Sequence, residues 1–119
     1  MSGSNPPFMS GVPELLVLQL LERRAMYGYE LVRAIRTATG DNISLGEGVI
    51  YPVLHSLERS GALKAESRLV NGRRRVYYRA MATGRQRLHG LKDRWARIRE
   101  GIDNVLDNVE AHPAESSHA

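Results

Sequence analysis

The chain has 119 residues, of which 42% are hydrophobic and 25% charged, with no cysteine and a formal net charge of +4. This length fits one folded domain, and the lack of cysteine excludes disulfide scaffolds, cysteine-ligated metal sites and cysteine nucleophiles. No apolar run approaches the ~20 residues of a membrane-spanning helix, and the first residues do not resemble a signal peptide. We therefore expect a cytoplasmic protein with no membrane partner.

Catalytic and metal-binding motifs are missing from the sequence. There is no G-x-S-x-G or Walker sequence, and the histidines do not have the spacing of metal ligands. We therefore expect neither an enzyme nor a metal or other cofactor. The four histidines are His55, His89, His112 and His118.

The charge is distributed unevenly along the chain. Residues 1–63 carry a net charge of −1, residues 64–99 carry +10, and residues 100–119 carry −5. A basic block inside a folded chain indicates a polyanionic partner such as nucleic acid. The alternative is an arginine-rich surface that is only solvated.

The first half of the chain predicts three helices after a flexible arm at residues 1–10. The first helix, at 13–24, begins with proline and has little polar face, which suggests that a second subunit covers part of it. The second spans 28–39. The third spans 47–60 and carries apolar residues at helical spacing, and Pro52 lies near enough to its start to cost little.

A β-hairpin follows the three helices. Residues 63–69 and 74–79 are predicted strands, and Asn71-Gly72 between them is a strong signal for a two-residue turn. Three helices followed by a hairpin is the element order of a winged helix-turn-helix, in which the third helix enters the major groove and the hairpin, or wing, lies along the backbone. We expect this DNA-binding domain to span residues 11–80.

The last predicted element is a long helix from about residue 82 to 110. We assign residues 81–110 to this dimerisation helix and residues 111–119 to a flexible tail. The apolar residues of the helix alternate at spacings of three and four over three heptads. One winged domain is too small to cover this stripe, so we predict a homodimer packed along it; the alternative is a helix folded back on its own domain. The stripe consists of Leu88, Leu91, Trp95, Ile98, Ile102, Val105 and Val109.

Three segments with ordered motifs closely resemble the PadR family of transcriptional regulators: Tyr27–Leu31 (YGYEL), Gly48–Gly61 (GVIYPVLHSLERSG) and Gly72–Arg79 (GRRRVYYR), followed by Gly84-Arg85. The likeness extends from about Gly11 to Ile102. The resemblance implies a mainly α fold with a small β-hairpin (α+β), and a homodimeric repressor that binds an inverted-repeat operator and is released by a small ligand. The single helix after the wing is similar to the small subgroup of this family.

Some positions depart from the family pattern. Gly46 stands where Ser or Thr usually caps the recognition helix, and Met81 stands where Thr usually caps the long helix. Val49 replaces a frequent Thr, so it can touch a thymine methyl group but cannot donate a hydrogen bond. These differences concern the operator that is read rather than DNA binding itself.

The DNA contacts are expected on the outer face of the third helix and on the wing. Tyr51 matches a family contact and can donate to a phosphate, although it could instead pack at a helix junction; His55 could reach DNA or be only solvated. Alternation sends Arg74 to the side of the wing opposite its two neighbours, so not all three arginines are expected to bind. The expected DNA-binding residues are Gly48, Val49, Tyr51, Pro52, His55, Lys64, Arg73, Arg74 and Arg75.

Trp95 is the only tryptophan and occupies the dimer stripe. In the small multidrug-responsive members that the chain resembles, a matching Trp stacks a flat ligand between subunits; the alternative is that Trp95 only fills the interface. Leu15 and Leu18 of the first helix are expected to line the same cleft. Arg99, one turn beyond Trp95, favours a planar neutral or anionic aromatic ligand.

Two other functions fit the same elements. One is a winged-helix adaptor that binds proteins through its heptad helix, which would not need an arginine-rich wing. The other is a winged-helix regulator of a different family, which would share the DNA contacts but not the ligand site.

Overall fold

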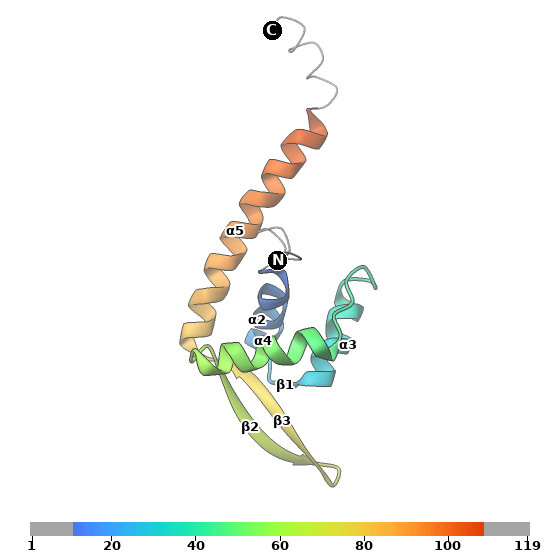
Figure 1. Ribbon diagram of the computed structural model, residues 1–119, viewed down its shortest axis with the longest axis vertical. Coiled ribbons are helices and arrows are strands. Elements are labelled where there is room, and N and C mark those ends of the chain that lie inside the picture. The colour runs from blue at the N-terminus through green and yellow to red at the C-terminus, as the bar shows by residue number, and fades with distance from the viewer. Residues whose placement is uncertain (1–10, 109–119) are drawn as a thin grey trace, which may run out of the picture.

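The computed structural model describes residues 11–108, so the predicted arm at 1–10 and tail at 111–119 lie outside the described residues. The fold is mainly helical with a small antiparallel sheet and a long C-terminal helix, as the sequence predicts (Figure 1). The elements are α2 (Val12–Arg23), β1 (Met26–Tyr27), α3 (Gly28–Ala38), α4 (Glu47–Arg59), β2 (Leu63–Val70), β3 (Arg73–Ala80) and α5 (Ala82–Asp107).

The first three of these helices enclose one apolar core. The predicted stripe of α4 faces inward, and Pro52 lies inside this helix without ending it. The side chains at the centre of the core are fully buried, so the helices are held together mainly by apolar burial, worth about 25 cal/mol per Å². The central residues are Val17, Leu18, Leu21, Leu31, Ile35, Ile50, Leu54 and Leu57.

The connection from α4 to the wing is a tight C-terminal cap. Gly61 has φ +85, a left-handed conformation that glycine adopts without strain. The Ala62 amide donates to the Leu57 carbonyl at 2.9 Å and the Gly61 amide to the Glu58 carbonyl at 3.0 Å, which is a Schellman motif. This cap turns the chain directly into β2.

The sheet has the strand order β1-β3-β2. β2 and β3 pair from Leu63↔Ala80 to Val70↔Arg73, so the predicted hairpin is confirmed. Asn71 and Gly72 both have positive φ, 52 and 77, as a type I′ turn requires. The sequence did not predict β1, which pairs Met26 and Tyr27 with β3 and is too short for an alternating pattern.

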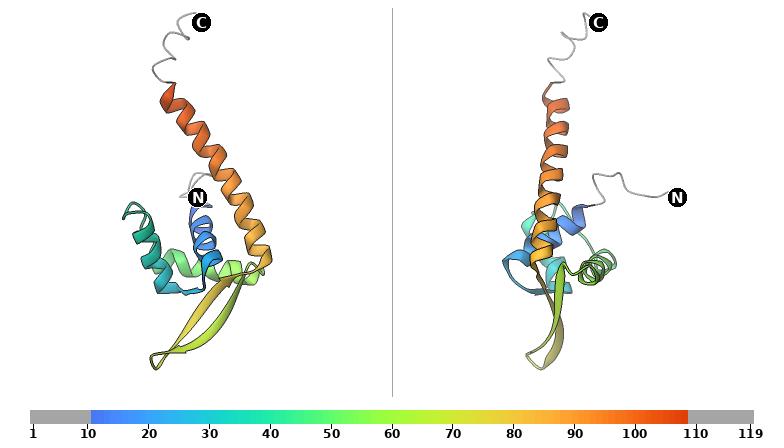
Figure 2. Two further views of the ribbon diagram at one scale, coloured as in Figure 1. Left: turned by 180° about the vertical axis from the view of Figure 1, so that it is seen from behind. Right: turned by 90° about the vertical axis from the view of Figure 1, so that its left-hand side faces the viewer.

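α5 has 26 residues and is about 39 Å long at 1.5 Å per residue. Its first turns pack on α2, and its distal part stands clear of the helical body, so that α5 and the wing extend in opposite directions (Figures 1 and 2). No helix within residues 11–108 is long and apolar enough to cross a membrane.

The stripe along α5 is divided between two environments. Leu88 is 3% exposed in the core, so the prediction that it lies in a dimer seam is wrong: the first turns of α5 already use it to cover α2. Leu91 packs against the same core, whereas Ile102 and Val105 are 43% and 67% exposed. Val109 lies outside the described residues.

Candidate nucleic-acid interface

A groove of about 540 Å³ lies between α4 and the wing. It brings together five of the nine residues that the sequence proposed for DNA binding: Tyr51 and His55 from α4, and Arg73, Arg74 and Arg75 from β3. The end of β1 contributes Tyr27, the start of α3 contributes Gly28 and Tyr29, and Val76 and Tyr78 complete the lining. None of the described residues that line this groove is acidic, so the groove is suited to a polyanion.

Tyr51 occupies the junction between α3 and α4. A Cβ atom on Gly28 would overlap the Tyr51 ring, so the ring lies directly against the backbone of α3. The residue is half-buried and lines the groove, which means that it packs at the helix junction and also faces the groove. The exposed His55 ring lies one turn along α4, and the centroids of the Tyr51 and His55 rings are 6.1 Å apart.

The three wing arginines differ in what holds them. Arg74 donates from Nη1 to the Ser67 hydroxyl at 3.2 Å, and the Arg75 guanidinium lies 4.3 Å from the centre of the Tyr27 ring. Arg73 is exposed at the tip. All three line the groove, because the groove reaches the hairpin tip and there borders residues from both faces of β3. Arg74 therefore lines the groove together with Arg73 and Arg75, although alternation places it on the opposite face of the strand.

The remaining candidates lie outside the groove. Gly48, Val49 and Pro52 are exposed on the N-terminal half of α4, and Val49 is 42% exposed. Lys64 is also exposed, but it pairs with Arg79 at the end of the hairpin farthest from the tip.

Tyr78 lies beneath the groove and is 4% exposed. Burial raises the pKa of its phenol above the ordinary value of 10.0, and the nearby Glu58 and Tyr51 act in the same direction. Tyr78 is therefore an uncharged residue under the groove at neutral pH.

Three residues where β1 passes into α3 are site residues that sequence reasoning missed. Tyr27, Gly28 and Tyr29 line the groove, and Tyr29 is 49% exposed. Periodicity says nothing about them because they belong to a two-residue strand and a helix start. Their only signal is that they belong to the YGYEL segment that carries the family resemblance.

Comparison with known proteins agrees with this geometry. The model of the transcriptional regulator PadR-like family matches residues 17–90. The chain belongs to the PadR-like family of transcriptional regulators.

A protein of Lysinibacillus sphaericus is 29% identical over 96 residues, which cover 80% of this chain and 88% of that protein. A transcriptional regulator of Mycobacterium tuberculosis is 51% identical over 41 residues, which cover 34% and 38% of the two chains.

Solved structures are similar over most of the chain. A protein of Streptococcus mutans has a TM-score of 0.74 at 28% identity, and the match covers 87% of this chain and 94% of that one. A PadR family regulator of Eggerthella lenta has a TM-score of 0.70 at 28% identity, with 81% and 82% coverage. The protein is thus a PadR-like, DNA-binding transcriptional regulator and not an enzyme.

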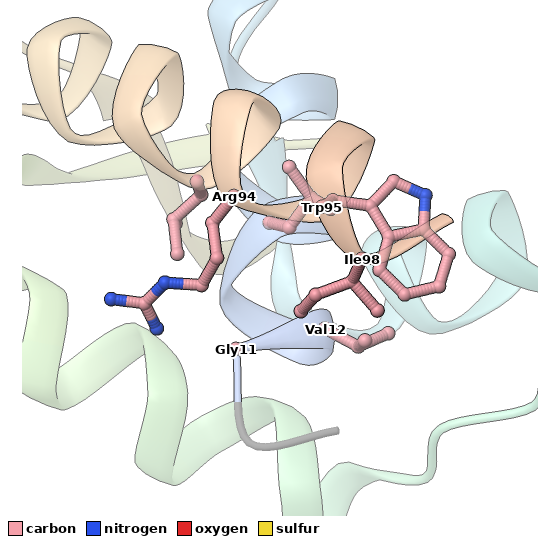
Figure 3. A pocket seen from close by; sticks show the side chains of 7 residues that line it. Gly11, Val12, Arg94, Trp95 and Ile98 are labelled. Carbon is pink, nitrogen blue, oxygen red and sulfur yellow. The ribbon is translucent and has the colours of Figure 1, made fainter. Parts of the chain in front are cut away.

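A second, shallow pocket of this PadR-like protein lies between α2 and α5 (Figure 3). The Trp95 ring and the Arg94 side chain extend to opposite sides, with Ile98 and Val12 between them. The enclosed space is about 10 Å³, roughly the room for one water molecule. The lining residues are Gly11, Val12, Leu15, Leu91, Arg94, Trp95 and Ile98.

Two of the residues predicted for this pocket do not line it in a single chain. Leu18 is 0% exposed and belongs to the core, because three residues after Leu15 the helix has turned it toward the domain interior. Arg99 does not line the pocket, which ends at Ile98; the basic residue that borders it is Arg94. Trp95 and Leu15 do lie together there.

Proposed function

We propose that this protein is a homodimeric repressor that binds an inverted-repeat operator and is released by a small planar aromatic effector. The observation that carries the proposal is the groove in which Tyr51 and His55 of α4 meet Arg73, Arg74 and Arg75 of the wing. A recognition helix beside an arginine-rich hairpin matches the arrangement in which base edges and backbone phosphates are contacted together.

In this proposal one part of the interface binds backbone phosphates and the other contacts base edges. The wing arginines and the Tyr51 hydroxyl hold phosphates, and Lys64 meets the backbone at the other end of the wing. Gly48, Val49 and Pro52 form the exposed surface of α4 that enters the major groove, where the Val49 methyl groups can contact a thymine methyl group.

The dimer rests on the distal half of α5. Ile102, Val105 and Leu106 are 43%, 67% and 64% exposed, an apolar surface that a second copy would cover. Two recognition helices must lie about 34 Å apart to read successive major grooves, and paired α5 helices would set that distance.

The effector site would lie at Trp95, between the two copies. A single chain encloses too little space for a planar ligand, so the second chain must supply the other wall. Arg94 borders the pocket, and Arg94 and Arg97 line an adjoining pocket in which Glu14 is ion-paired to Arg87. This surplus of positive charge favours an aromatic anion over a cationic drug. Such a ligand releases DNA if it binds better to a dimer with the wrong helix spacing.

The DNA contact is tested by changing both Arg73 and Arg75 to Ala and measuring a gel shift with DNA from upstream of the protein's own gene. We expect DNA retention to be lost at salt concentrations at which the wild type binds. Arg97→Ala with Arg99→Ala is the matched control, because it removes the same charge from α5. Unchanged retention by the wing variant would instead support a protein-binding adaptor.

The effector is tested by fluorescence titration of Trp95. We expect aromatic carboxylates to quench it, and Arg94→Gln to weaken their binding without changing the fold. Strong quenching by cationic dyes with none by aromatic acids would contradict the anionic ligand.

A further inference from the structure

Four side chains of the three-stranded sheet form one stacked row. The Arg75 guanidinium lies 4.3 Å from the centre of the Tyr27 ring, and the Arg68 guanidinium lies 4.5 Å from the centre of the Tyr77 ring. The two rings meet edge to face, with centroids 5.4 Å apart and an interplanar angle of 70°. The row thus runs Arg75, Tyr27, Tyr77, Arg68 across all three strands.

The register of the sheet places two like charges opposite each other, and the tyrosine rings keep them apart. Arg68 and Arg75 are direct partners across β2 and β3, and like charges in that position destabilise a hairpin. Tyr27 and Tyr77 are direct partners across β1 and β3. Each guanidinium lies over a ring instead of facing the other guanidinium, and both arrangements are favourable cation–π contacts.

The two ends of the row are not equivalent. Arg68 is ion-paired to Glu66 at 3.4 Å, whereas no carboxylate within residues 11–108 pairs with Arg75. Arg75 and Tyr27 line the groove beside Tyr51, and Arg68 and Tyr77 do not. The unneutralised charge is therefore the one on the groove side.

Stacking on a ring limits the conformations of a guanidinium and leaves its N–H edges free to donate. Less side-chain entropy is then lost when Arg75 binds an anion. The row also ties a two-stranded hairpin, which is marginally stable alone, to the start of α3.

We propose that Tyr27 is a positioning residue that presents Arg75 to a DNA phosphate, and that Tyr77 and Arg68 hold the Tyr27 ring from its other side. The inference rests on the proposed wing–DNA contact and assigns a role to residues outside the nine expected to touch DNA.

The test is a double-mutant cycle of Tyr27→Leu with Arg75→Ala, measured by fluorescence anisotropy with duplex DNA. We expect Tyr27→Leu to weaken binding by about 2- to 5-fold per wing, as loss of an exposed cation–π contact predicts, and Tyr27→Phe to bind like the wild type. With Arg75 already changed to Ala, Tyr27→Leu should add less than about 1.5-fold, because its effect acts through Arg75. Arg74→Ala is the matched control, since with it Tyr27→Leu should keep its full effect.

The salt dependence separates positioning from loss of a contact. Arg75→Ala should lower the magnitude of the slope of log K against log salt by about 1 per wing, and Tyr27→Leu should leave the slope unchanged. Equal effects of Tyr27→Leu with and without Arg75 would overturn the inference and leave Tyr27 a purely structural residue.

A readout on the free protein is independent of DNA. Ring currents from Tyr27 should shift the Arg75 Hδ resonances upfield in the wild type and in Tyr27→Phe, but not in Tyr27→Leu. Unshifted resonances in the wild type would overturn this inference alone. Failure of the wild type to bind DNA while the shift is present would instead overturn the proposed function, and the inference with it.

Discussion

Gly28 leaves room for only a hydrogen atom beneath the Tyr51 ring. We predict that Gly28→Ala displaces this ring, lowers the free energy of unfolding by about 1–3 kcal/mol and weakens DNA binding, because the new methyl group meets a packed neighbour. Urea unfolding and anisotropy measure the two effects. Gly90→Ala, on open α5 surface, is the control and should stabilise by roughly 0.5–1 kcal/mol. Unchanged stability and affinity of Gly28→Ala would show that Tyr51 does not need its observed position.

A second single residue, Tyr78, makes the stability of the fold depend on pH. Its pKa is raised by burial, so the folded state holds the phenolic proton more tightly than the unfolded chain does. The resulting stabilisation is fully present below about pH 10 and is lost as pH rises through the folded pKa. We predict that Tyr78→Phe flattens the fall in unfolding free energy between pH 9 and 11, measured by urea titration. Tyr29→Phe, at an exposed site, should keep the wild-type fall; an equal fall in both variants would contradict the assignment.

At the scale of the elements, the position of α5 is fixed by a close backbone contact where the helix follows β3. The Met81 amide donates to the Ala62 carbonyl at 2.9 Å, and a Cβ on Gly84 would overlap that same carbonyl group. We predict that Gly84→Ala lowers the unfolding free energy by more than about 2 kcal/mol, because a backbone group cannot rotate away as a side chain can. Thermal and urea unfolding measure this, with Gly101→Ala as the control in open space. A Gly84→Ala protein as stable as the control would mean that α5 is not fixed at this contact.

The elements also show what the sequence could predict. The helices, the stripe of α4 and the Asn71-Gly72 turn follow from local periodicity and turn chemistry, and all of them are present. β1 is too short to carry a period. Periodicity along a helix identifies an apolar face but not the neighbour that covers it. For this reason the sequence pattern predicts Leu18 in a cleft and Leu88 in a dimer seam, whereas the domain's own core buries both.

For the whole molecule, the structure divides the basic block at residues 64–99 into two surfaces. Its first part lies on the wing, and its second part lies on α5, which extends away from the wing (Figure 2). Net charge alone could not separate them, because both lie in one stretch of sequence. In the proposed account only the wing part meets DNA, and the α5 part serves the pocket at Trp95.

The proposed dimer predicts a whole-molecule response to one substitution. Ile102→Glu should yield monomers in sedimentation equilibrium, because it places a charge in the apolar surface that a second copy would cover. DNA affinity should fall strongly as well, since two linked wings bind far more tightly than one. Asn104→Glu adds the same charge on the opposite side of α5 and should remain dimeric. Persistence of the dimer in Ile102→Glu would contradict a seam along this stripe.

The salt dependence of DNA binding tests the central claim most directly, namely that α4 and the wing form a phosphate-binding interface. The measurement is the anisotropy of labelled DNA from upstream of the protein's own gene, titrated with the full chain over a series of salt concentrations. If two wings together neutralise six to eight phosphates, log K should fall with log salt at a slope near −6. Absence of binding at low salt, or a slope near zero, would contradict the account.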